Sequence, residues 1–206
     1  MSEVYDERAA RKAYIRNRQK RVFSITAAIL VVALVVASLF YFKVINISTG
    51  AKTADEPNYG QAVPCSAKNE DGTAMNWSEP NTVPVRVRNG TEFAGLAKAV
   101  GEALQDYQFN VTGVDDYTSH NVERTTIYFG ENAINPAYTL NAYFTDAVMV
   151  MDDRSDRLVD VVVGATFNNL EKGKKGGTIK DFQGCKTVDE MKATGLPKAS
   201  EHTEVN

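Results

Sequence analysis

The stretch VPVRVRNGTEFAGLAKAVGEAL, residues 83–104, decides the fold of this chain. It opens with an alternating pattern that is typical of a half-buried strand. Val85 and Val87 fall on one side of this strand, and Arg86 and Arg88 fall on the other. We therefore expect the valines to face a hydrophobic core.

The strand ends at Asn89-Gly90-Thr91, and a helical pattern follows at once. Thr91 is the expected N-cap, because a threonine hydroxyl can accept a hydrogen bond from the first turn of a helix. The apolar residues that follow recur at the spacing of one helical face; they are Phe93, Leu96, Ala97, Val100 and Leu104. The stretch thus predicts a strand, a tight turn and an amphipathic helix.

The same reasoning extends towards the C-terminus. Strands are predicted at 109–114, 125–129, 148–151 and 158–163, and a helix with Pro136 in its first turn is predicted over the run AYTLNAYF. The order is β-α-β-β-α-β-β, which favours the α/β class: a small two-layer sandwich with two helices on a mixed sheet. The strand order within the sheet stays open, because a split β-α-β arrangement and a singly wound mixed sheet both fit.

One transmembrane helix is predicted before this domain, at residues 22–42. The segment VFSITAAILVVALVVASLFYF holds no charged residue, and as a helix it would be about 31 Å long, close to the thickness of a bilayer core. The alternative is a cleaved secretory signal, which has a shorter apolar region followed closely by a small-residue cleavage site. The length of this segment favours an anchor that stays in the bilayer.

Charge gives the orientation of that anchor. Residues 1–21 contain seven basic and three acidic residues, whereas residues 43–206 contain 16 basic and 23 acidic residues. The positive-inside rule therefore predicts a basic cytoplasmic arm at 1–21 and an extracellular C-terminal part, in a single-pass protein of the cell membrane. An acidic outer part also argues against nucleic acid as a partner, since that binding depends on cations that neutralise phosphate.

Composition divides the outer part into three segments. Residues 43–82 are small and polar without periodicity, which predicts an extracellular linker. Residues 83–170 carry the strand and helix patterns and form the predicted folded domain. Residues 171–206 have few apolar side chains, which predicts a flexible C-terminal tail, with a short helical turn at TVDEMKA after Cys185.

The chain has two cysteines, Cys65 and Cys185, and both follow the apolar segment. Outside the cytosol such a pair normally forms a disulfide. A redox or metal site is the alternative, but the chain has no CxxC motif, and His120 and His202 show no ligand spacing. The sequence therefore favours a structural disulfide and predicts no metal site and no cofactor.

The candidate ligand-binding residues lie at the end of the first strand: Arg86, Arg88, Asn89, Gly90 and Thr91. Backbone N–H groups at a helix N-terminus can bind an anion, and two arginines beside them could hold a phosphate or carboxylate. The structural alternative is that Gly90 supplies the dihedral of the turn, that Thr91 caps the helix and that the arginines protect an edge strand. The sequence favours this structural alternative, because the longer glycine signature of a nucleotide loop is absent.

No catalytic residue can be nominated. The acidic stretch 152–160 also contains Arg154 and Arg157, and its spacing does not match a calcium loop. A solvated, salt-bridged turn is the expected structure there. The sequence shows no arrangement of a nucleophile with a base, so it predicts a protein that is not an enzyme.

Several of these motifs together resemble the LytR C-terminal domain family (LytR_C), in its stand-alone, membrane-anchored actinobacterial form. They are VRVRNGTEFAGLA at 85–97, QFNV at 108–111, TIYFG at 126–130 and DVVVG at 160–164, in an order that covers about residues 83–167. The chain departs from the family at Gln108, where a glycine often precedes the phenylalanine. The turn before the second strand is therefore expected to differ.

The resemblance implies a role in the cell envelope. Domains of this family often follow an LCP catalytic domain, which transfers glycopolymers onto peptidoglycan, and residues 43–82 are too few to hold that domain. The first hypothesis is a non-catalytic module that binds wall glycopolymer, peptidoglycan or an LCP-type ligase and supports envelope assembly or integrity. The second is an envelope enzyme acting on phosphoryl or glycan groups. The third is a signalling protein, which the short arm at 1–21 argues against.

Overall fold

The computed structural model describes residues 15–16, 18–20, 22–27, 29–32, 34, 56–173 and 176–205. The chain separates into two compact units, Met1–Ala51 and Lys52–Asn206.

The described residues between 15 and 34 are helical, and their side chains are exposed. Apolar side chains are exposed around this helix, including Phe23 at 72% and Leu34 at 67%. Among the described residues, no helix is long and apolar enough to cross a membrane. The predicted transmembrane segment 22–42 is described only in part, and residues 35–42 lie outside the described residues, as do 1–14 of the predicted cytoplasmic arm and 43–55 of the predicted linker.

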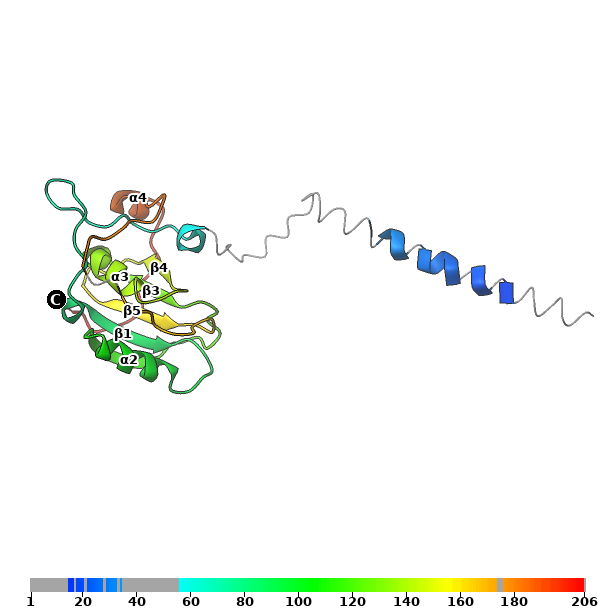
Figure 1. Cartoon of the computed structure of the whole chain (residues 1–206), viewed down its shortest axis with the longest axis horizontal. Helices are drawn as coiled ribbons and strands as arrows, with labels where there is room; N and C mark the ends of the chain where they lie inside the picture. Colours follow the sequence, from blue (N-terminus) through cyan, green and yellow to red (C-terminus); the bar gives the residue numbers. More distant parts are fainter. Residues whose placement is uncertain are drawn as a thin grey trace, which may run out of the picture. The chain divides into compact units, whose positions relative to one another are not determined.

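The second unit is built on one five-stranded sheet in the order β2-β1-β5-β3-β4. The labels β4, β3, β5 and β1 follow one another in this order across the domain in Figure 1. The strands are β1 (Pro84–Asn89), β2 (Asn110–Asp116), β3 (Thr126–Phe129), β4 (Val148–Met151) and β5 (Val159–Val163). β1 is parallel to β2 and β5, β3 is parallel to β4, and β3 and β5 are antiparallel. The sheet is therefore mixed, and the α/β class is confirmed.

Two helices, α2 (Leu96–Asp106) and α3 (Ile134–Asn141), pack on one face of this sheet. Their buried side chains join the strand residues of that face in one hydrophobic cluster; the fully buried members from the strands include Val85, Val87, Ile127, Phe129, Met149, Val159 and Val161. The opposite face carries Arg86, Arg88 and Asp160. The predicted direction of the valines and arginines of β1 is thus confirmed, and the domain has two layers.

α2 begins later than the sequence predicts. Its N-cap is Gly95, at a φ of 82°, and not Thr91. Phe93, predicted to lie on the buried stripe, precedes the helix and is 68% exposed. The predicted helical face holds from Leu96 onwards, where Ala97, Val100 and Leu104 are buried. The turn between Asn89 and the helix is therefore longer than the sequence predicts.

The end of α2 explains the unusual residue before β2. Gln108 has a φ of 71°, and its N–H donates to the carbonyl of Gln105 at 2.8 Å, while the N–H of Phe109 donates to that of Leu104 at 3.0 Å. These are the two hydrogen bonds of a Schellman C-cap, in which glycine is the usual left-handed residue. The turn is thus of the type that a glycine would serve, although glutamine occupies the position.

Residues 56–82 and 176–205 fall in the predicted linker and tail, but in the structure these residues pack against the domain. Asn58 is buried, and its side-chain amide exchanges hydrogen bonds with the backbone of Met149 on the edge strand β4, at 2.9 and 2.8 Å. Val63 and Ile179 are also buried in the core. Isolated apolar side chains anchor these segments. Because these side chains do not recur at a regular spacing, they leave no periodic signal in the sequence.

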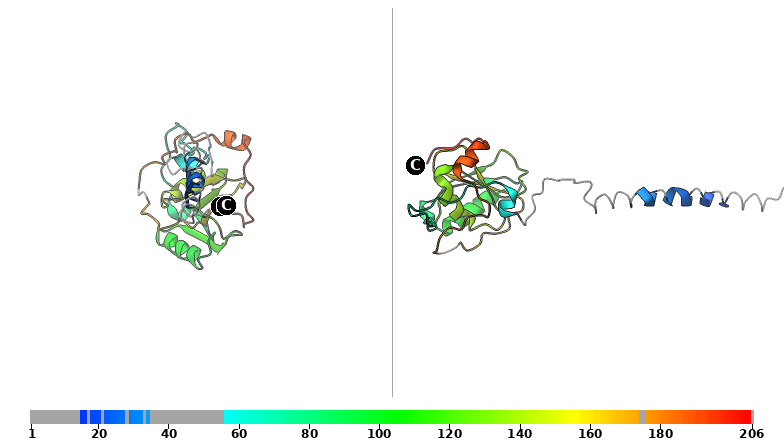
Figure 2. Two further views of the ribbon diagram at one scale, coloured as in Figure 1. Left: turned by 90° about the vertical axis from the view of Figure 1, so that its right-hand side faces the viewer. Right: turned by 90° about the horizontal axis from the view of Figure 1, so that it is seen from above.

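A disulfide joins the two segments. Cys65 is bonded to Cys185, as predicted, across a sequence separation of 120 residues. The N–H of Cys65 also donates to the carbonyl of Lys186, and the N–H of Lys186 donates to that of Val63. The predicted helical turn follows as α4 (Val188–Ala193), at the periphery of the domain in both views of Figure 2. Thr187 and Glu190 form a reciprocal capping box at its start.

Candidate functional site

The arginines of β1 meet a carboxylate in the centre of the sheet. Asp160 on β5 is fully buried, and it lies opposite Arg86 in the strand register. Arg86 donates to it through Nε and Nη2, both at 2.6 Å, and Arg88 donates through Nη2 at 2.8 Å. β1 is an inner strand, so the interpretation of these arginines as protection of a sheet edge is wrong.

A second ion pair adjoins this one. Arg154, in the turn after β4, donates to both oxygens of Asp152 and reaches Asp160 at 3.3 Å. Its side chain is 1% exposed. The predicted salt-bridged turn at 152–160 is therefore present, but at these residues it is buried and not solvated. We call Arg86, Arg88, Asp152, Arg154 and Asp160 the arginine cluster.

Charge within the arginine cluster is nearly balanced, with three guanidinium groups and two carboxylates. Burial raises the pKa of Asp160, but the hydrogen bonds from Arg86 and the charges of Arg88 and Arg154 outweigh this, so its pKa lies below the usual value. Nε of Arg88 has no hydrogen-bond partner among the described residues, and the guanidinium lies 4.7 Å from the centre of the Tyr117 ring.

The C-terminal residues lie against the arginine cluster. The carbonyl of Glu201 accepts a hydrogen bond from Nη1 of Arg86 at 3.0 Å. Asp156 binds both His202, at 3.2 Å, and the N–H of Val205, at 3.0 Å. The C-terminal residues thus bind Arg86 of the arginine cluster and Asp156 in the adjoining turn.

A low pKa at Asp160 predicts how the domain responds to acid. Because the unfolded pKa of an aspartate is about 3.9, the stability that Asp160 contributes is complete above that value and is lost as the pH falls through the lower folded pKa. We expect the melting temperature of the wild type to fall below about pH 4, and we expect this fall to be smaller in Asp160→Asn. Differential scanning calorimetry between pH 2.5 and 7 measures both. If the melting temperatures of the wild type and Asp160→Asn fall equally at low pH, the pKa of Asp160 is not lowered in the folded domain.

The other candidate residues, Asn89, Gly90 and Thr91, form a closed turn. Oδ1 of Asn89 accepts from the N–H and the hydroxyl of Thr91, at 3.1 and 2.9 Å, and the Thr91 hydroxyl accepts from the N–H of Phe93. The N–H of Gly90 donates to the carbonyl of Val163 at 3.0 Å. These N–H groups are occupied within the domain, so the turn does not present them to an anion.

Crowding, and not a special dihedral, explains Gly90. A Cβ atom there would lie 2.8 Å from the side chain of Val122 and 2.8 Å from the carbonyl oxygen of Val163. Gly90→Ala should therefore lower the free energy of unfolding by about 1–3 kcal/mol, through overpacking at the ends of β1 and β5. Urea unfolding measures the loss, with Gly113→Ala as the control, because a Cβ atom at Gly113 would make only ordinary contacts, the nearest at 3.5 Å. Unchanged stability in Gly90→Ala would contradict the role of crowding.

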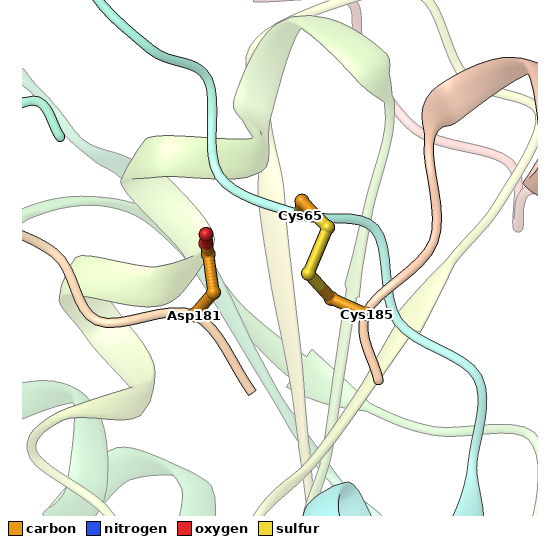
Figure 3. A group of neighbouring side chains, drawn as sticks. All are labelled: Cys65, Asp181 and Cys185. Carbon is orange, nitrogen blue, oxygen red and sulfur yellow. A yellow bond between two sulfur atoms is a disulfide. The ribbon is translucent and has the colours of Figure 1, made fainter. Parts of the chain in front are cut away.

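Cys65, Asp181 and Cys185 lie together and have atoms of the types that bind metals, as Figure 3 shows. The two sulfur atoms are bonded to each other, and a cysteine binds a metal as the thiolate. Asp181 is also engaged, since it accepts from the N–H of Ser66 at 2.7 Å and from Nζ of Lys68 at 2.5 Å. The group is a disulfide beside an ion pair, and it is not a metal site in this state.

Two adjoining hollows lie beside the helices, and the sequence analysis placed no site there. Trp77, Gly176 and Gly177 line both of them, and we call the pair the Trp77 hollow. The first has a volume of about 680 Å³, and its other lining residues include Asn81, Asp106, Tyr107, Gln108 and Tyr143. The second has a volume of about 630 Å³, with Tyr138, Asn141, Phe144, Glu171, Lys180 and Phe182 among its lining residues. The lone tryptophan of the predicted linker was the available signal.

Comparison with known proteins gives a family match for part of the chain. Residues 82–167 match the family model LytR_C, described as LytR cell envelope-related transcriptional attenuator. A solved structure with similarity to the chain is the soluble domain of a conserved hypothetical secreted protein, the Rv2700 ortholog, from Mycobacterium marinum. It is 22% identical, the match covers 55% of this chain and 79% of that one, and the TM-score is 0.41. The search of curated proteins gave no match.

Proposed function

We propose, from the match of residues 82–167 to the LytR_C family model, that the protein is a membrane-anchored, non-catalytic module of the cell envelope. Its external domain binds wall glycopolymer or peptidoglycan, or it binds an LCP-type ligase that attaches such polymers. Through this contact it supports the assembly or integrity of the envelope.

The observation that carries the binding role is the contrast between the arginine cluster and the Trp77 hollow. Asp160, at the centre of the cluster, is fully buried and bound by arginines, so its charge is used inside the domain. The lining of the hollow instead includes the half-buried rings of Trp77, Tyr107 and Phe182 and exposed amide side chains such as Asn81 and Gln108. A domain with buried ionic groups and an open, aromatic surface is suited to binding.

The anchor is supported by the helical residues between 22 and 34. Apolar side chains exposed around a helix need an apolar environment, and Val22, Ile25, Ile29 and Val32 are each more than half exposed. The basic residues before this helix support an orientation with the N-terminus in the cytoplasm. The disulfide supports an external location for the domain, because such bonds persist in oxidising compartments.

An envelope enzyme acting on phosphoryl or glycan groups is the second candidate, and one observation favours it. Nε of Arg88 is buried without a hydrogen-bond partner among the described residues, which leaves a donor for an anion. The substitution that separates the two candidates is Arg88→Ala, since Arg86 and Arg154 still neutralise Asp160 in that variant. An anion-binding enzyme loses its ligand, whereas a module that binds through the hollow keeps its partner.

Capture from the envelope tests the proposal. The full-length tagged protein is recovered from detergent-solubilised membranes, and purified wall material is used as a parallel bait. We expect specific retention either of an LCP-type ligase, identified by mass spectrometry, or of wall polymer. If neither is retained above the level of a tag-only control, the proposal is wrong.

A further inference from the structure

We infer that the Trp77 hollow is the binding site of the domain and that its ligand is an uncharged stretch of a polysaccharide chain. This inference rests on the proposed function and names the site and the ligand class.

The rings that line the hollow are held in fixed positions. Tyr107 and Tyr143 meet edge to face, with their centres 5.0 Å apart, in the first half. Tyr138 and Phe182 are 5.6 Å apart in the second half. The hydroxyl of Tyr138 also donates to the carbonyl of Pro64 at 2.8 Å. Rings that are fixed before binding lose little conformational freedom when a ligand arrives.

Trp77 links the two halves. It is half-buried against the core, and the backbone beside it pairs with a neighbouring segment, since Asn76 and Thr178 form an antiparallel bridge. Gly176 and Gly177 have φ values of 77° and 88°, and a Cβ atom at either would meet nothing within 4 Å. The backbone at these glycines is therefore open to a ligand that lies along Trp77. A sugar ring presents C–H bonds on its flat faces, which pack against an indole ring.

Polar groups around the rings match the hydroxyls at the edges of a sugar. Amide and hydroxyl side chains line both halves; they are Asn76, Ser78, Asn81 and Gln108 in the first and Asn141 and Thr178 in the second. Among the described residues, Oδ1 of Asn141 is a buried acceptor without a hydrogen-bond partner. Asn141 lines the second half, so this acceptor belongs to a side chain at the wall of the hollow. Aromatic walls with several neutral hydrogen-bonding groups are the chemistry that recognises a saccharide.

Charge decides between a neutral and an anionic chain. The first half is lined by the carboxylates of Glu79 and Asp106 without a basic residue among its described lining, and the second by Glu171 and Lys180. Within the described lining, three negative charges against one positive charge disfavour a polymer of phosphates or uronic acids. The volumes of the halves, about 680 and 630 Å³, fall within the usual range of small-molecule sites, and two such halves side by side suit successive sugars of one chain.

Tryptophan fluorescence gives a direct test, because Trp77 is the one tryptophan of the chain. The full-length protein in lipid nanodiscs is titrated with neutral tetrasaccharides of N-acetylglucosamine, of a hexose and of a pentose, and with poly(glycerol phosphate) as the anionic probe. We expect at least one neutral probe to shift or quench the emission in a saturable manner. The anionic probe should bind at least tenfold more weakly.

Variants place the binding in the hollow. By isothermal titration calorimetry, Trp77→Ala should weaken binding of the responsive tetrasaccharide at least tenfold, and Asn141→Ala should weaken it about threefold to tenfold. Phe93→Ala removes a ring that is 68% exposed and does not line the hollow, so it should bind like the wild type. Circular dichroism checks that each variant is folded, and Trp77→Phe, which keeps a ring, should retain most of the affinity.

Two results would overturn the inference. One is the absence of any change in Trp77 emission and of any calorimetric signal with all neutral probes. The other is binding that Trp77→Ala leaves intact. If the wild type still retains wall polymer or an LCP-type ligase in the capture experiment, the function stands and the hollow is not its site. If capture also fails, the proposed function fails with it.

Discussion

Replacement of Asp160 by alanine should lower the free energy of unfolding by about 3–5 kcal/mol. Asp160 is fully buried and receives hydrogen bonds from Arg86, Arg88 and Arg154. Removing one partner of a buried ion pair leaves the other charges without compensation in a medium of low dielectric constant, and this costs more than the pair contributes. In Asp160→Ala, Arg154 keeps Asp152, but Arg86 and Arg88 lose their carboxylate.

Chemical unfolding measures this loss of free energy of unfolding, and two further variants serve as comparisons. Asp116→Ala, at an exposed position at the end of β2, should change the stability by less than about 0.5 kcal/mol. Asp160→Asn keeps the shape and a hydrogen-bond acceptor but removes the charge, so its loss should lie between the two. If Asp160→Ala lowers the free energy of unfolding by less than about 1 kcal/mol, the arginines become solvated without cost in the variant, and the arginine cluster does not stabilise the domain.

The arginine cluster also shows how far the sequence could predict the site. Alternation within β1 was enough to place Arg86 and Arg88 on the face away from the valines. Their partner could not be predicted, because it depends on which strand lies next to β1. Asp160 is 74 residues from Arg86 in sequence, and it meets the arginine only because β5 lies between β1 and β3. Local patterns carry no information on strand order, so the central carboxylate was expected in a solvated turn.

Helix boundaries were predicted less well than strands. β4 lies where the pattern places it, since a run of β-branched and long apolar residues is bounded clearly. The predicted start of α2 was wrong. Thr91 has a side chain that is typical of an N-cap, but its hydroxyl is hydrogen-bonded within the turn, and the N-cap of the helix is Gly95. Phe93 fits the helical spacing by coincidence. Exposure of such a large ring could not be read from the spacing.

The segments that flank the domain were misread for a different reason. Residues 56–82 and 176–205 bury isolated apolar side chains, such as Val63, Ile179 and Met191. Periodicity, the main signal of secondary structure, is absent from segments of this kind. Residues of both segments line the Trp77 hollow, so the hollow could not be predicted from local patterns either. The pair Cys65 and Cys185 did indicate that the two segments are linked.

Loss of that link should have the second large effect. The double substitution Cys65→Ser and Cys185→Ser should lower the free energy of unfolding by about 2–5 kcal/mol, because the disulfide closes a long loop and restricts the unfolded chain. Treatment of the wild type with a reducing agent should lower its melting temperature to that of the double variant, and it should leave the variant itself unchanged. Calorimetry with and without the reductant measures both. If reduction leaves the wild type as stable as before, the disulfide does not stabilise the domain.

The same variant separates the stability of the domain from the integrity of the hollow. The disulfide ties the chain near Val63 to the chain near Lys186, whereas the bridge between Asn76 and Thr178, which line the hollow, lies elsewhere on the same two segments. With the disulfide removed, no covalent cross-link joins the two segments. Hydrogen bonds and one ion pair remain: the backbone bonds of Lys186 with Val63 and Cys65, the contacts of Asp181 with Ser66 and Lys68, and this bridge. We therefore expect Trp77 emission in the double variant to move towards that of an exposed indole below the global melting temperature. Emission that changes only with global unfolding would show that the core, and not the disulfide, holds Trp77 in place.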